Sequence, residues 1–64
     1  MPDIQVTNHG SIMLFQPMSE LGQSWLDEHL DGSDVQYWGN AVVVEPRYAR
    51  GLADAMLDDG LEVR

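Results

Sequence analysis

The polar and apolar residues near the start of the chain alternate as they do in a half-buried strand. In DIQVTN, Ile4 and Val6 fall on one face, and the HG pair that follows indicates a turn, because Gly10 can adopt a positive φ. Residues 11–16, SIMLFQ, predict a second strand that is apolar on both faces. Pro17 cannot donate to a ladder and should stop the pairing. This segment therefore predicts a β-hairpin.

A helical spacing of apolar residues follows the hairpin and predicts a helix over residues 19–30. The apolar stripe consists of Leu21, Trp25, Leu26 and Leu30. Ser19 is expected at the N-cap, with Glu20 favourably placed in the first turn. The DGSD segment should end the helix, because Gly32 can adopt the left-handed cap conformation.

The second half of the chain predicts another hairpin and another helix. VQYW and AVVVE flank Gly39-Asn40, a strong two-residue hairpin signal, and Pro46 suits the first position of a helix. Gly60 is expected just beyond the end of that helix, and LEV is expected to form a short last strand. The predicted helix packs through Tyr48, Leu52 and Met56, with Ala49, Ala53 and Ala55 as small packing partners.

The two halves resemble each other. A shift of 29 residues places HGSIMLFQP over WGNAVVVEP and aligns Gly10 with Gly39, Pro17 with Pro46 and Gly22 with Gly51. The element order also repeats, either through duplication or through convergence on a good local solution. We therefore predict one α+β domain over 1–64, with ββα units at about 1–31 and 32–64 and a short terminal strand. Two helices should cover one face of an antiparallel sheet.

The other face of this sheet is expected to keep some apolar surface, because IMLF and AVVV are apolar at consecutive positions. Such a patch often marks an interface, although sheet curvature and long polar side chains could cover it. This face is the basis of an alternative function, a small interaction module or homodimer. The residues that would matter are Met13, Phe15, Val42 and Val44, or their opposite-face neighbours.

Composition restricts the class of protein. With 64 residues and no cysteine, the chain has a thin core without disulfides, which fits a reducing compartment. Its longest apolar runs are too short to span a membrane, and its first residues lack the features of a secretory signal. We therefore expect a cytoplasmic protein.

The charge balance is the most unusual feature. Eleven acidic residues face three arginines and no lysine, which gives a net charge of -8. This excess disfavours direct contact with nucleic acid or anionic membrane and favours a basic partner protein. The alternative is that the acidity serves solubility alone.

Candidate chemistry is sparse. His9 and His29 lack the spacing of a zinc motif, and DGSD lacks the ligand spacing of an EF-hand. The serines lie in no nucleophile motif, and no phosphate-binding loop is present. We therefore expect no enzyme activity, no metal site and no cofactor.

The acids concentrate where two helices should end, although a helix C-terminus carries partial negative charge. Arg47 and Arg50 likewise lie at the positive N-terminus of the second helix. Carboxylates one helical turn apart lie about 5–6 Å from each other at Cβ, a length scale similar to that of phosphates along DNA. Rows of such groups can imitate a duplex backbone and occupy a basic groove. The candidate partner-binding residues are Asp27, Glu28, Asp31 and Asp34 at the first end, and Asp58, Asp59 and Glu62 at the second.

This profile resembles the small acidic proteins of phages and mobile elements, including anti-CRISPR inhibitors that mimic DNA. The resemblance lies in small size, the lack of cysteine and lysine, and acidic segments such as DEHLDGSD and LDDGLE. It implies binding to a CRISPR surveillance complex or nuclease. The sequence itself is compatible with either a monomer or a homodimer. The resemblance implies no particular fold, because these inhibitors share none, and it transfers no individual residue.

Overall fold

Two hairpins build the sheet, and each contains a glycine with a positive φ at its turn. The computed structural model describes residues 1–30 and 36–64. Strands β1 (Ile4–Asn8) and β2 (Met13–Pro17) flank a loop in which Gly10 has φ 81°. Strands β3 (Gln36–Trp38) and β4 (Ala41–Val44) flank a two-residue turn in which Gly39 has φ 66°. Both predicted hairpins are confirmed.

The two helices begin at the predicted residues. Helix α1 (Glu20–His29) is capped by Ser19, whose Oγ accepts a hydrogen bond from the Gly22 N–H at 3.1 Å. Helix α2 (Pro46–Asp58) begins with proline, whose missing N–H costs nothing in the first turn. The predicted end of α1 at Gly32 lies outside the described residues.

Gly60 ends α2 as the sequence predicts. It has φ 89° and donates its N–H to Leu57 O at 3.0 Å, while Leu61 N–H donates to Met56 O at 3.0 Å. These two bonds form a Schellman motif, which satisfies carbonyl groups in the last turn and redirects the chain. The motif sends the last residues back toward the sheet.

The strand pairing repeats after a shift of 29 residues. The order is β1-β2-β4-β3, and all neighbours are antiparallel. Leu14 pairs with Val43, its own counterpart under the shift, so the β2–β4 register is symmetric about this pair. The registers of the two hairpins also correspond. Asn8 pairs with Met13 in the first hairpin, and the residues 29 positions later, Tyr37 and Val42, pair in the second. The strands therefore have an approximate two-fold arrangement.

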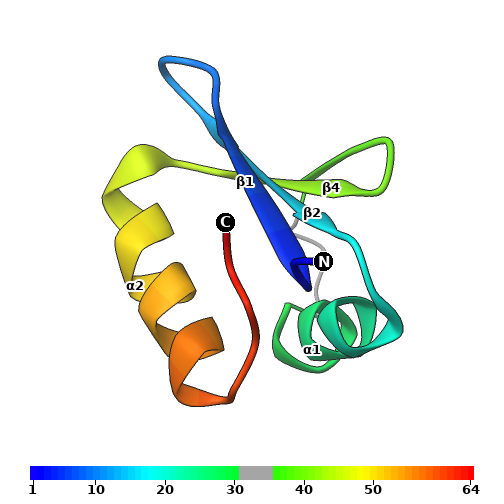
Figure 1. Ribbon diagram of the computed structural model, residues 1–64. Helices are drawn as coiled ribbons and strands as arrows, with labels where there is room; N and C mark the ends of the chain where they lie inside the picture. Colours follow the sequence, from blue (N-terminus) through cyan, green and yellow to red (C-terminus); the bar gives the residue numbers. More distant parts are fainter. Residues whose placement is uncertain (31–35) are drawn as a thin grey trace.

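The last residues add a short parallel pairing next to β1. Val63 bridges to Ile4, and the Ile4 N–H donates to Glu62 O at 3.0 Å. Arg64 N–H donates to Ile4 O at 3.0 Å, and Val6 N–H donates to Arg64 O at 2.6 Å. The predicted terminal strand is therefore present as a bridge. Figure 1 shows this segment running between the two helices, which lie on the same side of the sheet.

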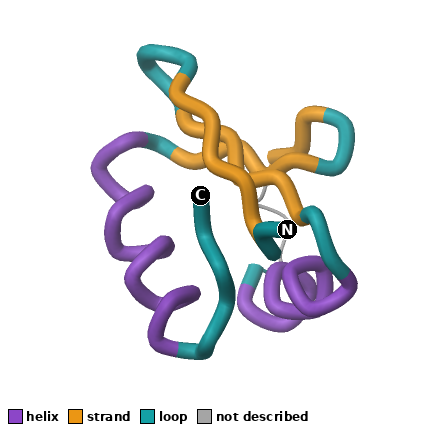
Figure 2. The backbone as a smooth tube through the Cα atoms, in the orientation of Figure 1, coloured by secondary structure: helices purple, strands orange, loops and turns teal. Residues whose placement is uncertain are grey.

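The core lies between the sheet and this helical layer, whose arrangement is also clear in Figure 2. Its fully buried side chains are Ile4, Phe15, Leu26 and Met56. Two stripe residues do not join it, because Leu21 is 55% exposed and Tyr48 is 58% exposed. Gly22 is buried in the region where Leu21 was expected, because α1 approaches the Asp3 backbone there. Neither described helix is long and apolar enough to cross a membrane.

Candidate partner-binding surface

The last turn of α1 contacts the end of α2 through one carboxylate. Trp25 Nε1 donates a hydrogen bond to Asp59 Oδ2 at 2.7 Å, and His29 Nε2 lies 3.7 Å from the same oxygen. The His29 ring stacks on the Trp25 indole, with centroids 4.0 Å apart and planes at 11°. Although Trp25 belongs to the core, its indole N–H therefore fixes the C-terminal ends of the two helices next to each other.

This contact places two helix ends that carry predicted site residues next to each other. Asp27 and Glu28 lie in the last turns of α1, and Asp58 is the last residue of α2. All three are exposed, as is Asp59 at the cap of α2. Asp27 accepts a hydrogen bond from Gln23 Nε2 at 3.0 Å, which leaves its charge in place. We call Asp27, Glu28, Asp58 and Asp59 the acidic end.

The other three predicted site residues are not part of this set. Asp31 and Asp34 lie outside the described residues. The carboxylate of Glu62 lies 2.9 Å from the Arg64 guanidinium, and its backbone N–H donates to Asp3 Oδ2. Asp3 also contacts Ser19 at the N-terminal end of α1, so Glu62 lies near the start of that helix rather than its end.

Basic side chains neutralise little of the acidic end. Arg47 Nε lies 3.3 Å from Glu45 Oε2 at the start of α2, and Arg64 pairs with Glu62. In the described part of the chain, no carboxylate lies within ion-pair distance of Arg50, although Asp54 lies one helical turn away at the i, i+4 spacing that allows such a pair. Among the basic side chains of residues 1–30 and 36–64, His29 alone lies near a carboxylate of the acidic end.

Asp3 is a structural acid that sequence reasoning missed. Its carboxylate accepts hydrogen bonds from Ser19 Oγ at 2.6 Å and from the Glu62 N–H at 2.9 Å. These bonds lower the pKa of Asp3 below its ordinary value, first through the Glu62 backbone N–H and then through Ser19. The sequence carries no local signal for this role, because Ser19 and Glu62 lie 16 and 59 positions away from Asp3 along the chain.

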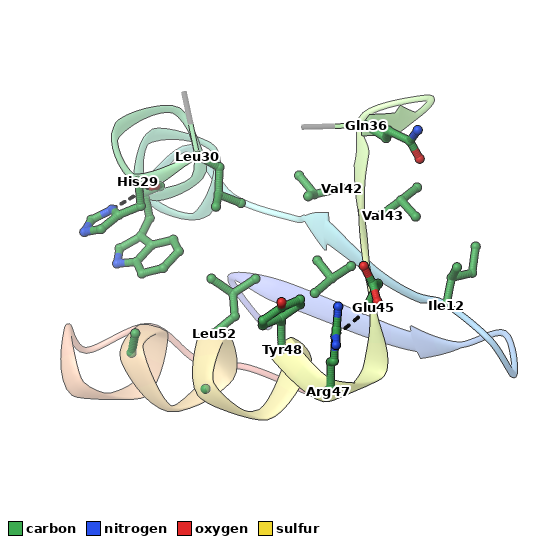
Figure 3. A pocket seen from close by; sticks show the side chains of 14 residues that line it. Ile12, His29, Leu30, Gln36, Val42, Val43, Glu45, Arg47, Tyr48 and Leu52 are labelled. Atoms are coloured by element: carbon green, nitrogen blue, oxygen red, sulfur yellow. Dashed lines mark hydrogen bonds and ion pairs between the residues drawn. The ribbon is translucent and has the colours of Figure 1, made fainter. Parts of the chain in front are cut away.

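A groove of about 920 Å³ lies between the helices and β4. Figure 3 shows Leu30, Val42, Tyr48 and Leu52 around it. Trp25 and His29 also line the groove. Because both residues contact Asp59, the groove and the acidic end adjoin. We call this hollow the interhelical groove.

The open face of the sheet carries less apolar surface than the sequence suggests. Phe15 and Val42 face the helices and are buried, whereas their neighbours Leu14 and Val43 face outward and are half-buried. Trp38 is the large exposed side chain on this face, and the His9 ring lies 5.7 Å from it, centroid to centroid. The exposed apolar patch is therefore centred on β3.

The described residues contain no group of three or more His, Asp or Glu side chains that could hold a metal ion. Comparisons with protein-family models, curated proteins and solved structures find no match to this chain.

Proposed function

We propose that the protein binds the basic, nucleic-acid-binding surface of a partner protein and competes there with nucleic acid. The observation that supports this most is the Asp59 contact with Trp25 and His29, because it brings two acid-bearing helix ends together. A single helix end offers a short row of carboxylates, whereas two adjacent ends offer a broader surface to a basic groove.

The energetic cost of these charges supports the same proposal. Asp27, Glu28 and Asp58 lie where the helix dipole disfavours negative charge, at roughly 0.3–1 kcal/mol each before screening. A small domain has little stability to lose. Selection for binding explains why such a domain keeps these charges, and counterion release would drive the association as it drives DNA binding.

Within this class, we propose that the partner is a CRISPR effector whose DNA-binding groove is blocked in the bacterial cytoplasm. The proposal predicts that the protein restores phage plaque formation in cells with active CRISPR immunity. It also predicts that the purified protein displaces labelled target duplex from the effector, which fluorescence anisotropy would measure.

A matched pair of double variants tests the acidic end. Asp27→Asn with Glu28→Gln removes two charges at this end, whereas Glu20→Gln with Asp54→Asn removes two exposed charges elsewhere. We expect displacement to weaken several-fold with the first pair and to change little with the second, because steering acts locally once salt screens longer distances. Equal effects of the two pairs would contradict the proposed surface.

The alternative is an interaction module that uses the open sheet face, and the 59% exposure of Trp38 favours it. Its binding should resist salt, because apolar docking is not screened. Trp38→Ser should then abolish association, while the acidic-end variants should bind normally.

A further inference from the structure

We infer that the interhelical groove receives an aliphatic or aromatic side chain of the partner, flanked by arginine or lysine residues that contact the acidic end. This inference rests on the proposed function, because the charges that select a basic partner adjoin the groove. It adds a specific recognition element, since mimicry of a phosphate backbone alone requires no apolar site.

The groove leaves apolar surface accessible. Leu30 and Leu52 are only partly buried, and Tyr48 is 58% exposed at the groove wall. Val44, which is half-buried, also lines the groove. An apolar side chain inserted here would release water from this surface, which is the usual driving force of binding in a concave site.

Gly51 lies in the interior of α2 and lines the groove. A Cβ at this position would meet nothing within 4 Å, so packing within the described structure does not require glycine. Glycine weakens a helix interior because the unfolded chain loses more freedom on folding. Its absent side chain widens the groove, and a side chain from another molecule can use that space.

Charge complementarity identifies the occupant of the groove. The Asp59 carboxylate contacts two lining residues, Trp25 and His29, so it lies at the edge of the groove. A cation adjacent to the inserted side chain would therefore meet the acidic end. A second copy of this chain is disfavoured, because each copy carries a net charge of -8.

The test uses a phage-displayed library of random dodecapeptides, selected on the wild-type protein. Selected peptides are then measured against Gly51→Leu, which fills the groove, and Ser24→Leu, which adds the same side chain to an exposed α1 position outside the lining. Gly51→Ala serves as the conservative variant. Circular dichroism confirms that each variant is folded.

We expect enrichment of peptides in which an apolar residue is flanked by arginine or lysine. Their binding should fall at least about tenfold with Gly51→Leu and remain within about twofold with Ser24→Leu and Gly51→Ala, because blocking an anchor pocket removes a dominant contact. Weaker peptide binding to the Asp27→Asn, Glu28→Gln variant would support a contact between the peptide cations and the acidic end.

If the peptides bound Gly51→Leu as tightly as wild type, the proposal that the groove is a binding site would be overturned. A failure to enrich any peptide would also overturn it. Enrichment of purely cationic peptides that bind every groove variant would also overturn it, while leaving the proposed function intact. If the selected peptides were apolar, lacked cations and bound the acidic-end variant as tightly as wild type, the proposed contact between partner cations and the acidic end would be overturned. Loss of partner displacement by the acidic-end variant is measured separately, so the failures of the two proposals are distinguishable.

Discussion

Gly22 and Gly51 occupy corresponding positions of the two halves, yet their surroundings differ. At Gly22 a Cβ would collide with the Asp3 carbonyl oxygen and lie 3.1 Å from Ile4 Cδ1. At Gly51 a Cβ would meet nothing within 4 Å. One glycine is therefore required by the close approach of α1 to the chain before β1, and the other is not.

We expect Gly22→Ala to lower the free energy of unfolding by about 2–3 kcal/mol, because the backbone it meets cannot yield as a flexible side chain can. Gly51→Ala should raise it by about 0.5–1 kcal/mol through helix propensity. Urea denaturation of both variants would measure the difference. A stable Gly22→Ala would contradict the close packing described at this position.

Asp3 gives stability a predictable pH dependence. Its pKa is lower in the folded state, because two hydrogen bonds favour the carboxylate. A lowered pKa contributes stability that is present above the unfolded value, about 3.9, and is lost as pH falls through the folded value. Asp3→Asn should therefore be less stable than wild type near neutral pH.

The stability gap between wild type and Asp3→Asn should close as pH falls from about 5 toward 2. Chemical denaturation at several pH values would measure the gap. Asp54→Asn is the matched control, because Asp54 is exposed and makes no hydrogen bond among the described residues. A gap that is constant with pH would show that the Asp3 carboxylate does not act through its charge.

At the scale of elements, the sequence predicts what local chemistry controls. Gly39, Pro46 and Gly60 set the second turn and both ends of α2 through their own backbone properties. The strand order could not be predicted this way. Neither could two contacts between distant parts of the chain: Trp25 with Asp59, separated by 34 positions, and Asp3 with Glu62, separated by 59 positions. The acids at the C-terminal ends of the helices indicated the candidate surface. They did not indicate the Asp59 contact that holds the two ends next to each other.

The Trp25–Asp59 hydrogen bond should be the main polar contact between the ends of the helices. Trp25→Phe keeps most of the ring packing and removes the donor, so we expect a loss of about 1–2 kcal/mol. Asp59→Asn keeps an acceptor and should cost less. A double-mutant cycle with Asp59→Ala would measure the coupling, and additive effects would show that this bond does not stabilise the pair.

For the whole molecule, the charge of -8 acts against the compact state. Repulsion among exposed carboxylates is screened as the Debye length falls from about 30 Å at 0.01 M salt to 3 Å at 1 M. The same charges therefore weaken the fold and are proposed to strengthen binding, so salt should affect the two properties in opposite directions.

We expect the free energy of unfolding to rise by on the order of 1 kcal/mol between about 10 and 500 mM sodium chloride. Asp27→Asn with Glu28→Gln should raise it by about 0.5–1 kcal/mol at low salt and by less at high salt. Thermal melts across a salt series would test both. Destabilisation by the double variant would instead indicate that these carboxylates support the fold.

The parallel pairing of the last residues with β1 has a mechanical consequence. A force that draws Ile4 and Val63 apart along the chain pulls two adjacent parallel segments in opposite directions. It therefore loads their hydrogen bonds together in shear rather than opening them one at a time. Optical-tweezer pulling through residues 1 and 64 should need a higher force than pulling through residues 8 and 64, which spares these bonds from direct shear. This small domain should therefore resist unfolding by molecular motors better than its equilibrium stability suggests.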